Sequence, residues 1–354
     1  MIKSIFKVLG YGLLALATLD IAARIDDAVT EGAAFWQPYT LDALFRPSEF
    51  GREGIPGKRY GKWQMNQLGY RGPEPVPGRI NVVTFGASET IGLYESPGKE
   101  YPRQLETLLN ANPSGPQYNV VNLGLFGMRI GRTSYLVRGI EQTQAKVAII
   151  YPSPANYFGT NVPLCGQQTR PVASDMGPLD YLRIGGKAEQ LFKKHAPEEV
   201  MTLLRQYGIW RATRETTLLD RVPESTIEAL KADIACAARA AEQAGARVIL
   251  VTHANYFGSA LQFKDMPMML AWRRFYPRLK EGGFLDLEHR TNTAVKELGV
   301  ELNMPVVDAA ASIPSGSIYF ADFVHFTDVG STQMAKLLEP TVVQLASQNY
   351  INPK

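Results

Sequence analysis

From Ile80 onward the chain alternates short apolar runs with longer segments of helical period, and this feature constrains its fold most strongly. The apolar runs are rich in strand-forming residues, and the segments between them are long enough to form helices that cross back over a sheet. The expected strands are 80–85, 118–122, 146–151, 246–251 and 304–308, and the expected helices include 101–111, 131–144, 224–244, 285–299 and 327–345. This alternation predicts an α/β fold, a three-layer α/β/α sandwich with a five-stranded parallel sheet.

One interval breaks the alternation, because about ninety residues separate the third and fourth expected strands, far more than a crossover needs. We interpret residues 160–222 as a mostly helical insertion over the ligand-binding edge of the sheet, which either shapes a substrate site or serves oligomer formation. The segment 259–283 is expected to pack beneath it or to form another part of the mouth of the site. Four large apolar residues are expected to pack inside the insertion: Leu191, Leu203, Leu204 and Trp210.

The N-terminus carries two lysines followed by an apolar run from Val8 to Leu19. Twelve residues are too few to span a bilayer but are typical of a signal sequence, and Ala15-Leu16-Ala17 is a weak cleavage site. Alternatively, residues 5–25 remain as a signal anchor with the rest of the chain outside the cytoplasm, which we slightly favour. A buried amphipathic helix is the third interpretation. Residues 1–25 are thus a signal anchor or signal peptide, 26–79 an extension of turns and short strands, and 80–354 the main domain.

Composition excludes several classes of function. The formal charge is +3, with 37 basic and 34 acidic residues interspersed, so nucleic-acid binding has no support. Cys165 and Cys236 form no CxxC motif; they are either a disulfide in an exported chain or two free buried thiols. Because no His/Asp/Glu cluster has metal-ligand spacing, we expect no metal and no cofactor.

A candidate nucleophile follows the first strand of the regular part. In Asn81-Val-Val-Thr-Phe-Gly-Ala-Ser88, apolar strand residues run into Gly86, which permits a sharp exit that places Ser88 above the strand end. Ligands of open parallel sheets bind at that end. A lone serine after a strand is more often a turn or cap residue, so Ser88 needs a base and an oxyanion hole to act as a nucleophile.

Three other strand ends supply such partners. The second strand leads into a turn with Gly127 before a helix, and the third leads to Asn156. Near the C-terminus Asp322 precedes His325 by three residues, so the acid can contact one ring nitrogen while the other faces outward.

These pieces, in this order, resemble the SGNH or GDSL hydrolase family over residues 64–345, with the insertion unmatched. The resemblance implies a flavodoxin-like SGNH fold and assigns the roles residue by residue. Ser88 matches the nucleophile, His325 the base and Asp322 its orienting acid, while Ser88, Gly127 and Asn156 match the oxyanion donors.

The chain departs from that family at two places. Gly-Ala-Ser stands for Gly-Asp-Ser at the nucleophile, and Pro-Ala-Asn-Tyr at 154–157 stands for Gly-x-Asn-Asp, which alters the backbone beside Asn156. The turn at 66–74 also looks like one that precedes the nucleophile strand in exported members. Within it, Arg71 is expected either to contact an anionic substrate or, as we favour, to form a structural ion pair. The α/β-hydrolase motif GxSxG is not satisfied, because Thr90 stands at its last glycine.

Some residues compete for these roles. Ala-Asn-Tyr-Phe-Gly occurs at 155–159 and again at 254–258, so Asn255 rivals Asn156 or lines the pocket. His253 also follows a strand but has no acid at short spacing, so it is expected to line the site or to form local hydrogen bonds. His195 and His289 are expected to be solvated. Aromatic residues that would stack on sugar rings, or that simply pack, are Tyr157, Phe158, Tyr256 and Phe257.

The resemblance implies a serine esterase that forms an acyl-Ser88 intermediate. The first expectation is removal of O-acetyl or other short acyl groups from a carbohydrate outside the cytoplasm, in the periplasm or at the cell surface, by a protein held at the inner membrane by its N-terminus. The alternatives are a lipid or thioester hydrolase, an O-acetyltransferase of envelope polysaccharide, and a non-catalytic polysaccharide-assembly protein. The sequence leaves the acyl group, the acceptor and the oligomeric state open.

Overall fold

The structure, a computed structural model, describes residues 2–167, 171, 181–258 and 261–351. Its centre is a sheet of five parallel strands in the order β6-β5-β7-β8-β9. The strands are β5 (Ile80–Gly86), β6 (Tyr118–Asn122), β7 (Val147–Tyr151), β8 (Arg247–Val251) and β9 (Val306–Val307). All five expected strands are present, and only β9 is markedly shorter than predicted.

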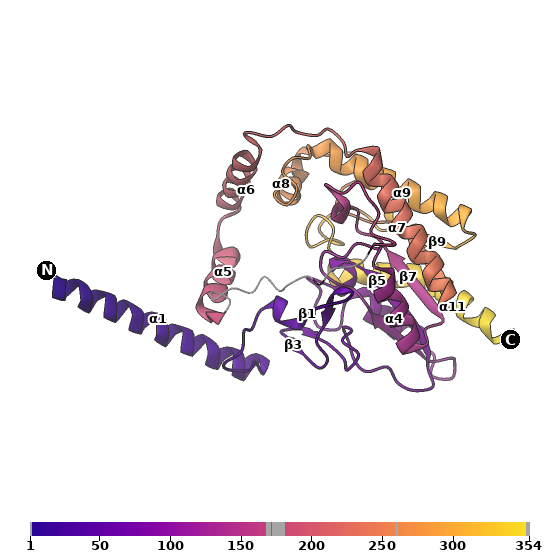
Figure 1. The fold of residues 1–354 in the computed structure, drawn as a ribbon, viewed down its shortest axis with the longest axis horizontal. Coiled ribbons are helices and arrows are strands. Elements are labelled where there is room, and N and C mark those ends of the chain that lie inside the picture. Colours follow the sequence, from indigo (N-terminus) through magenta and orange to yellow (C-terminus); the bar gives the residue numbers. More distant parts are fainter. Residues whose placement is uncertain (1, 168–170, 172–180, 259–260, 352–354) are drawn as a thin grey trace.

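Helices cover both faces of this sheet (Figure 1). Because side chains alternate along a strand, Val82 faces the layer of α3 (Tyr101–Leu109) and α11 (Asp328–Ile351), and Val83 faces the opposite layer. The opposite layer contains α4 (Thr133–Thr143), α7 (Glu224–Gln243) and α9 (Glu281–Glu301). The predicted α/β/α sandwich is therefore confirmed. After β6 the chain crosses over β5 and adds the remaining strands on the other side, so the strand order reverses between β5 and β7. Ligands bind at such a reversal point in doubly wound sheets.

The N-terminal region begins with α1 (Ile2–Glu31), which extends beyond residue 25. Its stretch Phe6–Glu31 is long and apolar enough to cross a membrane, a description that fits both an anchor and a signal sequence. Its apolar side chains are largely exposed, so the interpretation as a buried amphipathic helix is wrong.

Turns and short strands follow, as expected. They comprise the 3-10 helix η1 (Leu41–Leu44), the hairpin of β1 (Phe45–Ser48) with β2 (Gly51–Gly54), and the hairpin of β3 (Arg59–Tyr60) with β4 (Trp63–Gln64). Arg71 is buried and its guanidinium donates to Gly92 O at 2.8 Å and to Glu100 Oε2 at 3.0 Å. The predicted structural ion pair is confirmed.

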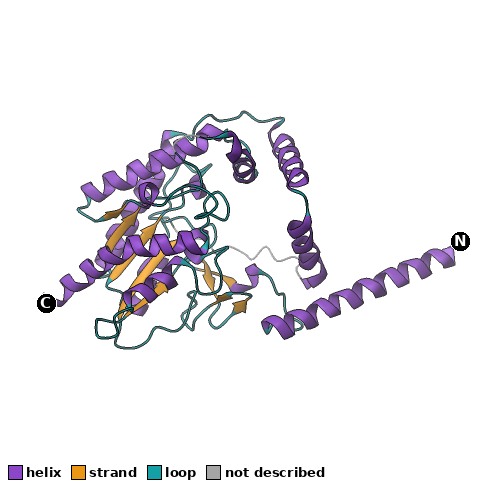
Figure 2. Cartoon of the chain, turned by 180° about the vertical axis from the view of Figure 1, so that it is seen from behind, coloured by secondary structure: helices purple, strands orange, loops and turns teal. Residues whose placement is uncertain are grey.

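The described part of the insertion contains two helices that stand away from the sheet, α5 (Arg183–His195) and α6 (Glu198–Thr213), as Figure 2 shows from behind. Residues 168–170 and 172–180 of the predicted insertion lie outside the described part. α5 packs against α1, while α6 packs against α8 (Met266–Arg273), which follows the 3-10 helix η4 (Phe263–Asp265). We call α5 and α6 the arm.

The prediction that the arm's apolar residues pack internally is wrong. Four of them are 51–65% exposed: Leu191, Leu203, Leu204 and Trp210. Helical periodicity indicates that a helix has an apolar face, but it does not indicate which element covers that face. Because each arm helix has its main contacts with a different neighbour, much of its apolar surface faces solvent.

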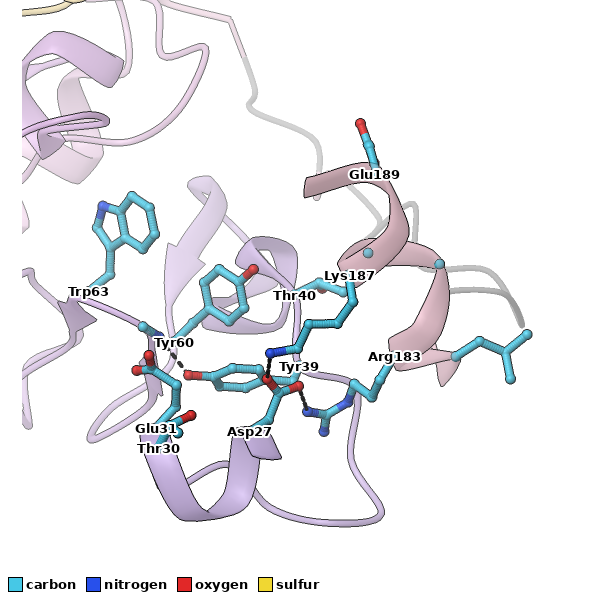
Figure 3. A pocket seen from close by; sticks show the side chains of 14 residues that line it. Asp27, Thr30, Glu31, Tyr39, Thr40, Tyr60, Trp63, Arg183, Lys187 and Glu189 are labelled. Carbon is cyan, nitrogen blue, oxygen red and sulfur yellow. Dashed lines mark hydrogen bonds and ion pairs between the residues drawn. The ribbon is translucent and has the colours of Figure 1, made fainter. Parts of the chain in front are cut away.

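Charged side chains join the arm to the first helix. Arg183 Nη1 lies 2.8 Å from Asp27 Oδ2, and Lys187 Nζ lies 2.8 Å from Asp27 Oδ1. Figure 3 shows both cations converging on this carboxylate beside Tyr39. They border a cavity of about 660 Å³ between α1, the β3–β4 hairpin and α5.

A disulfide joins Cys165, at the start of the insertion, to Cys236 in α7, with the Cα atoms 6.3 Å apart. Beside it, Asp233 Oδ1 accepts hydrogen bonds from the backbone N–H groups of Leu164 and Cys165, at 2.7 and 2.8 Å. Of the two alternatives left by the sequence, the structure therefore has the bonded pair.

Candidate active site

Ser88 lies where β5 leaves the sheet, as the first residue of the short helix α2 (Ser88–Ile91). A Cβ atom at Gly86 would meet Thr90 Oγ1 at 2.1 Å and Tyr151 O at 2.7 Å, so only glycine permits this close turn between strand and helix. The turn lifts the Ser88 hydroxyl above the end of a central strand, next to the end of β7.

The structure brings Ser88, His325 and Asp322 into one hydrogen-bonded chain. His325 Nε2 lies 2.8 Å from Ser88 Oγ, and His325 Nδ1 lies 2.8 Å from Asp322 Oδ2. Asp322 Oδ1 also accepts the backbone N–H groups of Val324 and His325, which fixes the carboxylate on its own turn. The spacing of three residues therefore produces the local contact that the sequence predicted.

The environment of His325 shifts its basicity. Burial lowers the pKa of the imidazole, but the hydrogen bond and charge of Asp322 outweigh burial, with Glu89 and Glu95 adding to the effect. The net result is a pKa above the ordinary histidine value. Neutral His325, with its proton on Nδ1 toward Asp322, presents Nε2 as an acceptor for the Ser88 hydroxyl.

Gly127 and Asn156 line the same cavity as Ser88. Gly127 has φ +66°, a left-handed conformation that glycine adopts without strain. Asn156 lies in the 3-10 helix η2 (Pro154–Tyr157), and its Nδ2 donates to Met128 O at 3.0 Å. An amide nitrogen carries two hydrogens, so this bond joins Asn156 to the Gly127 loop and leaves a second donor.

The other site residues suggested by the sequence do not reach this cavity. Tyr157 is fully buried, and its hydroxyl donates to Asp233 Oδ2 at 2.9 Å, because η2 turns the ring into the protein. Asn255 Oδ1 accepts the backbone N–H of Phe257, and neither residue lines the cavity. Phe257 is itself buried and stacks on Trp272. A substrate contact by Tyr157 or stacking on Phe257 is therefore excluded in this structure.

His253 differs most from expectation. It is 1% exposed, and its two ring nitrogens contact carboxylates, with Nδ1 2.7 Å from Glu288 Oε2 and Nε2 3.2 Å from Glu89 Oε1. The acids that the sequence did not place near it come from α9 and from the residue after Ser88. His253 neither lines the cavity nor has a ring nitrogen free to serve as the base.

The cavity at Ser88 has a volume of about 740 Å³. Its inner wall is formed by the strand-end loops, and its outer walls come from the arm and from the α8 region. Arm residues Met201 and Arg205 line it, as do Met268 and Phe275 of the 259–283 segment. The insertion thus lies over the ligand-binding edge, and the 259–283 segment forms part of the mouth, as predicted.

Glu89 is a residue that the sequence interpretation missed. Its carboxylate is 2% exposed and lies 3.3 Å from Ser88 Oγ. In the sequence, the signal for this buried charge is an acid directly after the candidate nucleophile and before the apolar Ile91. Within the described residues, no group of three or more His, Cys, Asp or Glu side chains is arranged to hold a metal ion.

The chain is similar in fold to several solved structures. They include the lipase/acylhydrolase from Enterococcus faecalis, with 14% identity, a TM-score of 0.44, and coverage of 74% of this chain and 95% of that one. TesA has 12% identity and a TM-score of 0.43, with coverage of 75% and 99%. The acetyl xylan esterase AlAXEase has 14% identity and a TM-score of 0.43, with coverage of 74% and 100%. No family model matches the chain, and no curated protein sequence matches it. At such identities these likenesses concern the fold alone.

Proposed function

We propose that the protein is a serine ester hydrolase of the SGNH (GDSL) family that works through an acyl-Ser88 intermediate. The observation that carries the proposal is the hydrogen-bonded chain from Asp322 through His325 to Ser88, which opens onto a cavity also lined by Gly127 and Asn156. A nucleophile, its base and an orienting acid at one strand edge are the parts that acyl transfer needs.

In the first half-reaction the Ser88 oxygen attacks the ester carbonyl carbon while its proton passes to His325 Nε2. Asp322 accepts the Nδ1–H of the resulting imidazolium and stabilises its charge. The carbonyl electrons move onto oxygen, where the backbone N–H groups of Ser88 and Gly127 and the second amide hydrogen of Asn156 stabilise the oxyanion. When the carbonyl re-forms, the alcohol leaves with the proton from His325. In the second half-reaction water replaces the alcohol, and the acid is released as Ser88 regains its proton.

As substrate we propose an O-acetylated or similarly short-acylated carbohydrate outside the cytoplasm. α1 supports an N-terminal anchor in the inner membrane, and the Cys165–Cys236 bond is typical of an oxidising compartment such as the periplasm. A formal net charge of only +3, without basic blocks in the sequence, agrees with a polymer substrate that is not nucleic acid.

A second candidate is a hydrolase of longer acyl esters or thioesters. It is favoured by the apolar side chains that the outer walls contribute to the cavity, which include Met201, Met268 and Phe275. Such side chains would bury a longer acyl chain, at about 0.8 kcal/mol for each methylene group.

The test is hydrolysis of p-nitrophenyl acetate by the full-length protein in detergent, beside Ser88→Ala and a matched control, Ser114→Ala, on an exposed turn. We expect activity that is lost only with Ser88, and covalent labelling of Ser88 by a fluorophosphonate. A chain-length series of p-nitrophenyl esters and acetate release from acetylated polysaccharides then separate the two substrate classes. Full activity in Ser88→Ala would refute the mechanism.

A further inference from the structure

A second hydrogen-bonded chain reaches the candidate nucleophile and has no role in the mechanism above. From Ser88 Oγ, Glu89 Oε2 is 3.3 Å away, and Glu89 Oε1 accepts the Ser153 hydroxyl at 2.8 Å. The same Oε1 lies 3.2 Å from His253 Nε2, and His253 Nδ1 lies 2.7 Å from Glu288 Oε2. The three ionisable residues of this chain, Glu89, His253 and Glu288, are at most 3% exposed, and we call them the Glu–His–Glu network.

The contacts fix the charges of this network. Ionised carboxylates only accept hydrogen bonds, so both ring nitrogens of His253 must donate, and only the imidazolium does so. Burial disfavours the charges of His253 and Glu89, but their contacts outweigh it, and they raise the pKa of His253 to about 10 and lower the pKa of Glu89 to about 2. Two carboxylates and one imidazolium leave a net charge of −1 next to Ser88.

The Ser88 hydroxyl has one proton and two acceptors within reach, His325 Nε2 at 2.8 Å and Glu89 Oε2 at 3.3 Å. While His325 is neutral, the shorter contact takes the proton, which is the arrangement required for attack. Once His325 binds a proton from solvent, its Nε2–H donates to Ser88 Oγ. The Ser88 hydroxyl then donates its own proton to the other acceptor, Glu89 Oε2.

We propose that Glu89, held as a carboxylate by His253 and Glu288, is a positioning residue that accepts the Ser88 hydroxyl when His325 is protonated, and thereby sets the pH at which the enzyme switches on. This inference rests on the proposed esterase function only for its kinetic readout. Glu89 stabilises the protonated, inactive state of His325, so its buried charge raises the pH at which the enzyme becomes active.

Besides Glu89, the groups that raise the pKa of His325 are Asp322 and Glu95, whereas burial lowers it. Asp322 belongs to its own turn, Glu95 follows α2, and the Tyr94 ring lies 5.6 Å from the imidazole. Burial raises the pKa of both Glu95 and Tyr94, and Glu95 is hydrogen bonded by Ser331. Further charged or titratable side chains line the cavity or face Glu89: Glu198, Arg205, Arg274 and Tyr276. Of the acids near His325, Glu89 contacts the same Ser88 hydroxyl as His325 does, so a substitution of Glu89 tests the proposal.

The experiment is an NMR titration of the full-length protein in detergent, with the histidines labelled at Cε1. The sequence has four histidines, so the spectrum contains few signals. In the wild type we expect His253 to stay cationic from pH 5 to 8. In Glu89→Gln, which removes the charge and keeps the shape, we expect the pKa of His325 to fall by about 0.5 to 2 units. This is the Coulomb effect of a unit charge about 6 Å away, the upper bound set by the 2.8 and 3.3 Å contacts through Ser88 Oγ, at an effective dielectric between about 80 and 20. Glu53→Gln is the matched control, because Glu53 is a buried carboxylate that pairs with Arg138 instead.

In Glu89→Gln, the midpoint of the acidic limb of the pH profile of kcat/KM should shift to lower pH by the same number of units. In Glu89→Asp, which keeps the charge, the midpoint should remain near that of the wild type. An unchanged pKa of His325 in Glu89→Gln would overturn the proposal. So would a wild-type His253 that titrates near its ordinary value, a measurement that does not depend on the folding of any variant. Because the NMR readout needs no turnover, failure to find esterase activity leaves this test intact.

Discussion

Removal of the disulfide is expected to lower stability without removing activity. The bond between Cys165 and Cys236 spans 71 residues of sequence and encloses the whole arm. In the chain-entropy treatment, a cross-link over such a loop restricts the unfolded ensemble by about 15 cal/mol/K, or about 4 kcal/mol at 25 °C. The double variant Cys165→Ala/Cys236→Ala should therefore be less stable by roughly that amount.

The folded state should change little, because Asp233 still holds the backbone N–H groups of Leu164 and Cys165 in place. Guanidinium unfolding followed by circular dichroism should show a lower midpoint and a somewhat larger m-value, since the unlinked chain exposes more surface. Esterase activity at 25 °C should stay within a few-fold of the wild type, and wild type treated with reductant should match the variant. An unchanged midpoint would refute the entropic argument. Loss of activity in a folded variant would show that the bond shapes the site.

Three further predictions concern the site itself. Asp322→Asn should lower kcat by about 10⁴-fold, because His325 is then held in the wrong tautomer; a variant within tenfold of the wild type would contradict that role. Asn156→Ala should lower kcat by about 100 to 1000-fold with an unchanged melting temperature, whereas Asn255→Ala should stay near the wild type, and equal effects would remove Asn156 from the oxyanion hole. Since the pKa of His325 is raised and only the neutral ring is a base, kcat/KM should rise with pH through a midpoint above about 6.5; a flat profile between pH 5 and 8 would exclude His325.

The sheet was predictable because it depends on local patterns, and the Ser88–His325–Asp322 chain because its motifs, in their order, resemble those of the SGNH family. Strand residues such as Val83 lie in short apolar runs, and Asp322 and His325 are three residues apart. The parallel topology then brings all strand ends to one edge, so Ser88 and His325 meet there although their sequence positions are distant.

The features that were missed depend on tertiary contacts. Glu89 and His253 are separated by 164 positions, and no spacing rule joins them. Tyr157 was expected either to stack on a sugar ring or to pack, and the 3-10 turn points it to buried Asp233. Trp210 belongs to α6, and the neighbouring α8 covers only part of that helix. In each case the residue type was visible in the sequence, and its partner was not.

The distance of 237 positions between Ser88 and His325 has a consequence for the biogenesis of the protein. Contacts between remote positions form late, since the loop between them must first be ordered. During synthesis from the N-terminus, Ser88 is made long before His325. The helix α11, which follows His325 and packs against α3, is the last to join its helical layer. A nascent chain that ends before His325 therefore lacks the proposed base, so the proposed ester cleavage would begin only after this C-terminal part is made and folded.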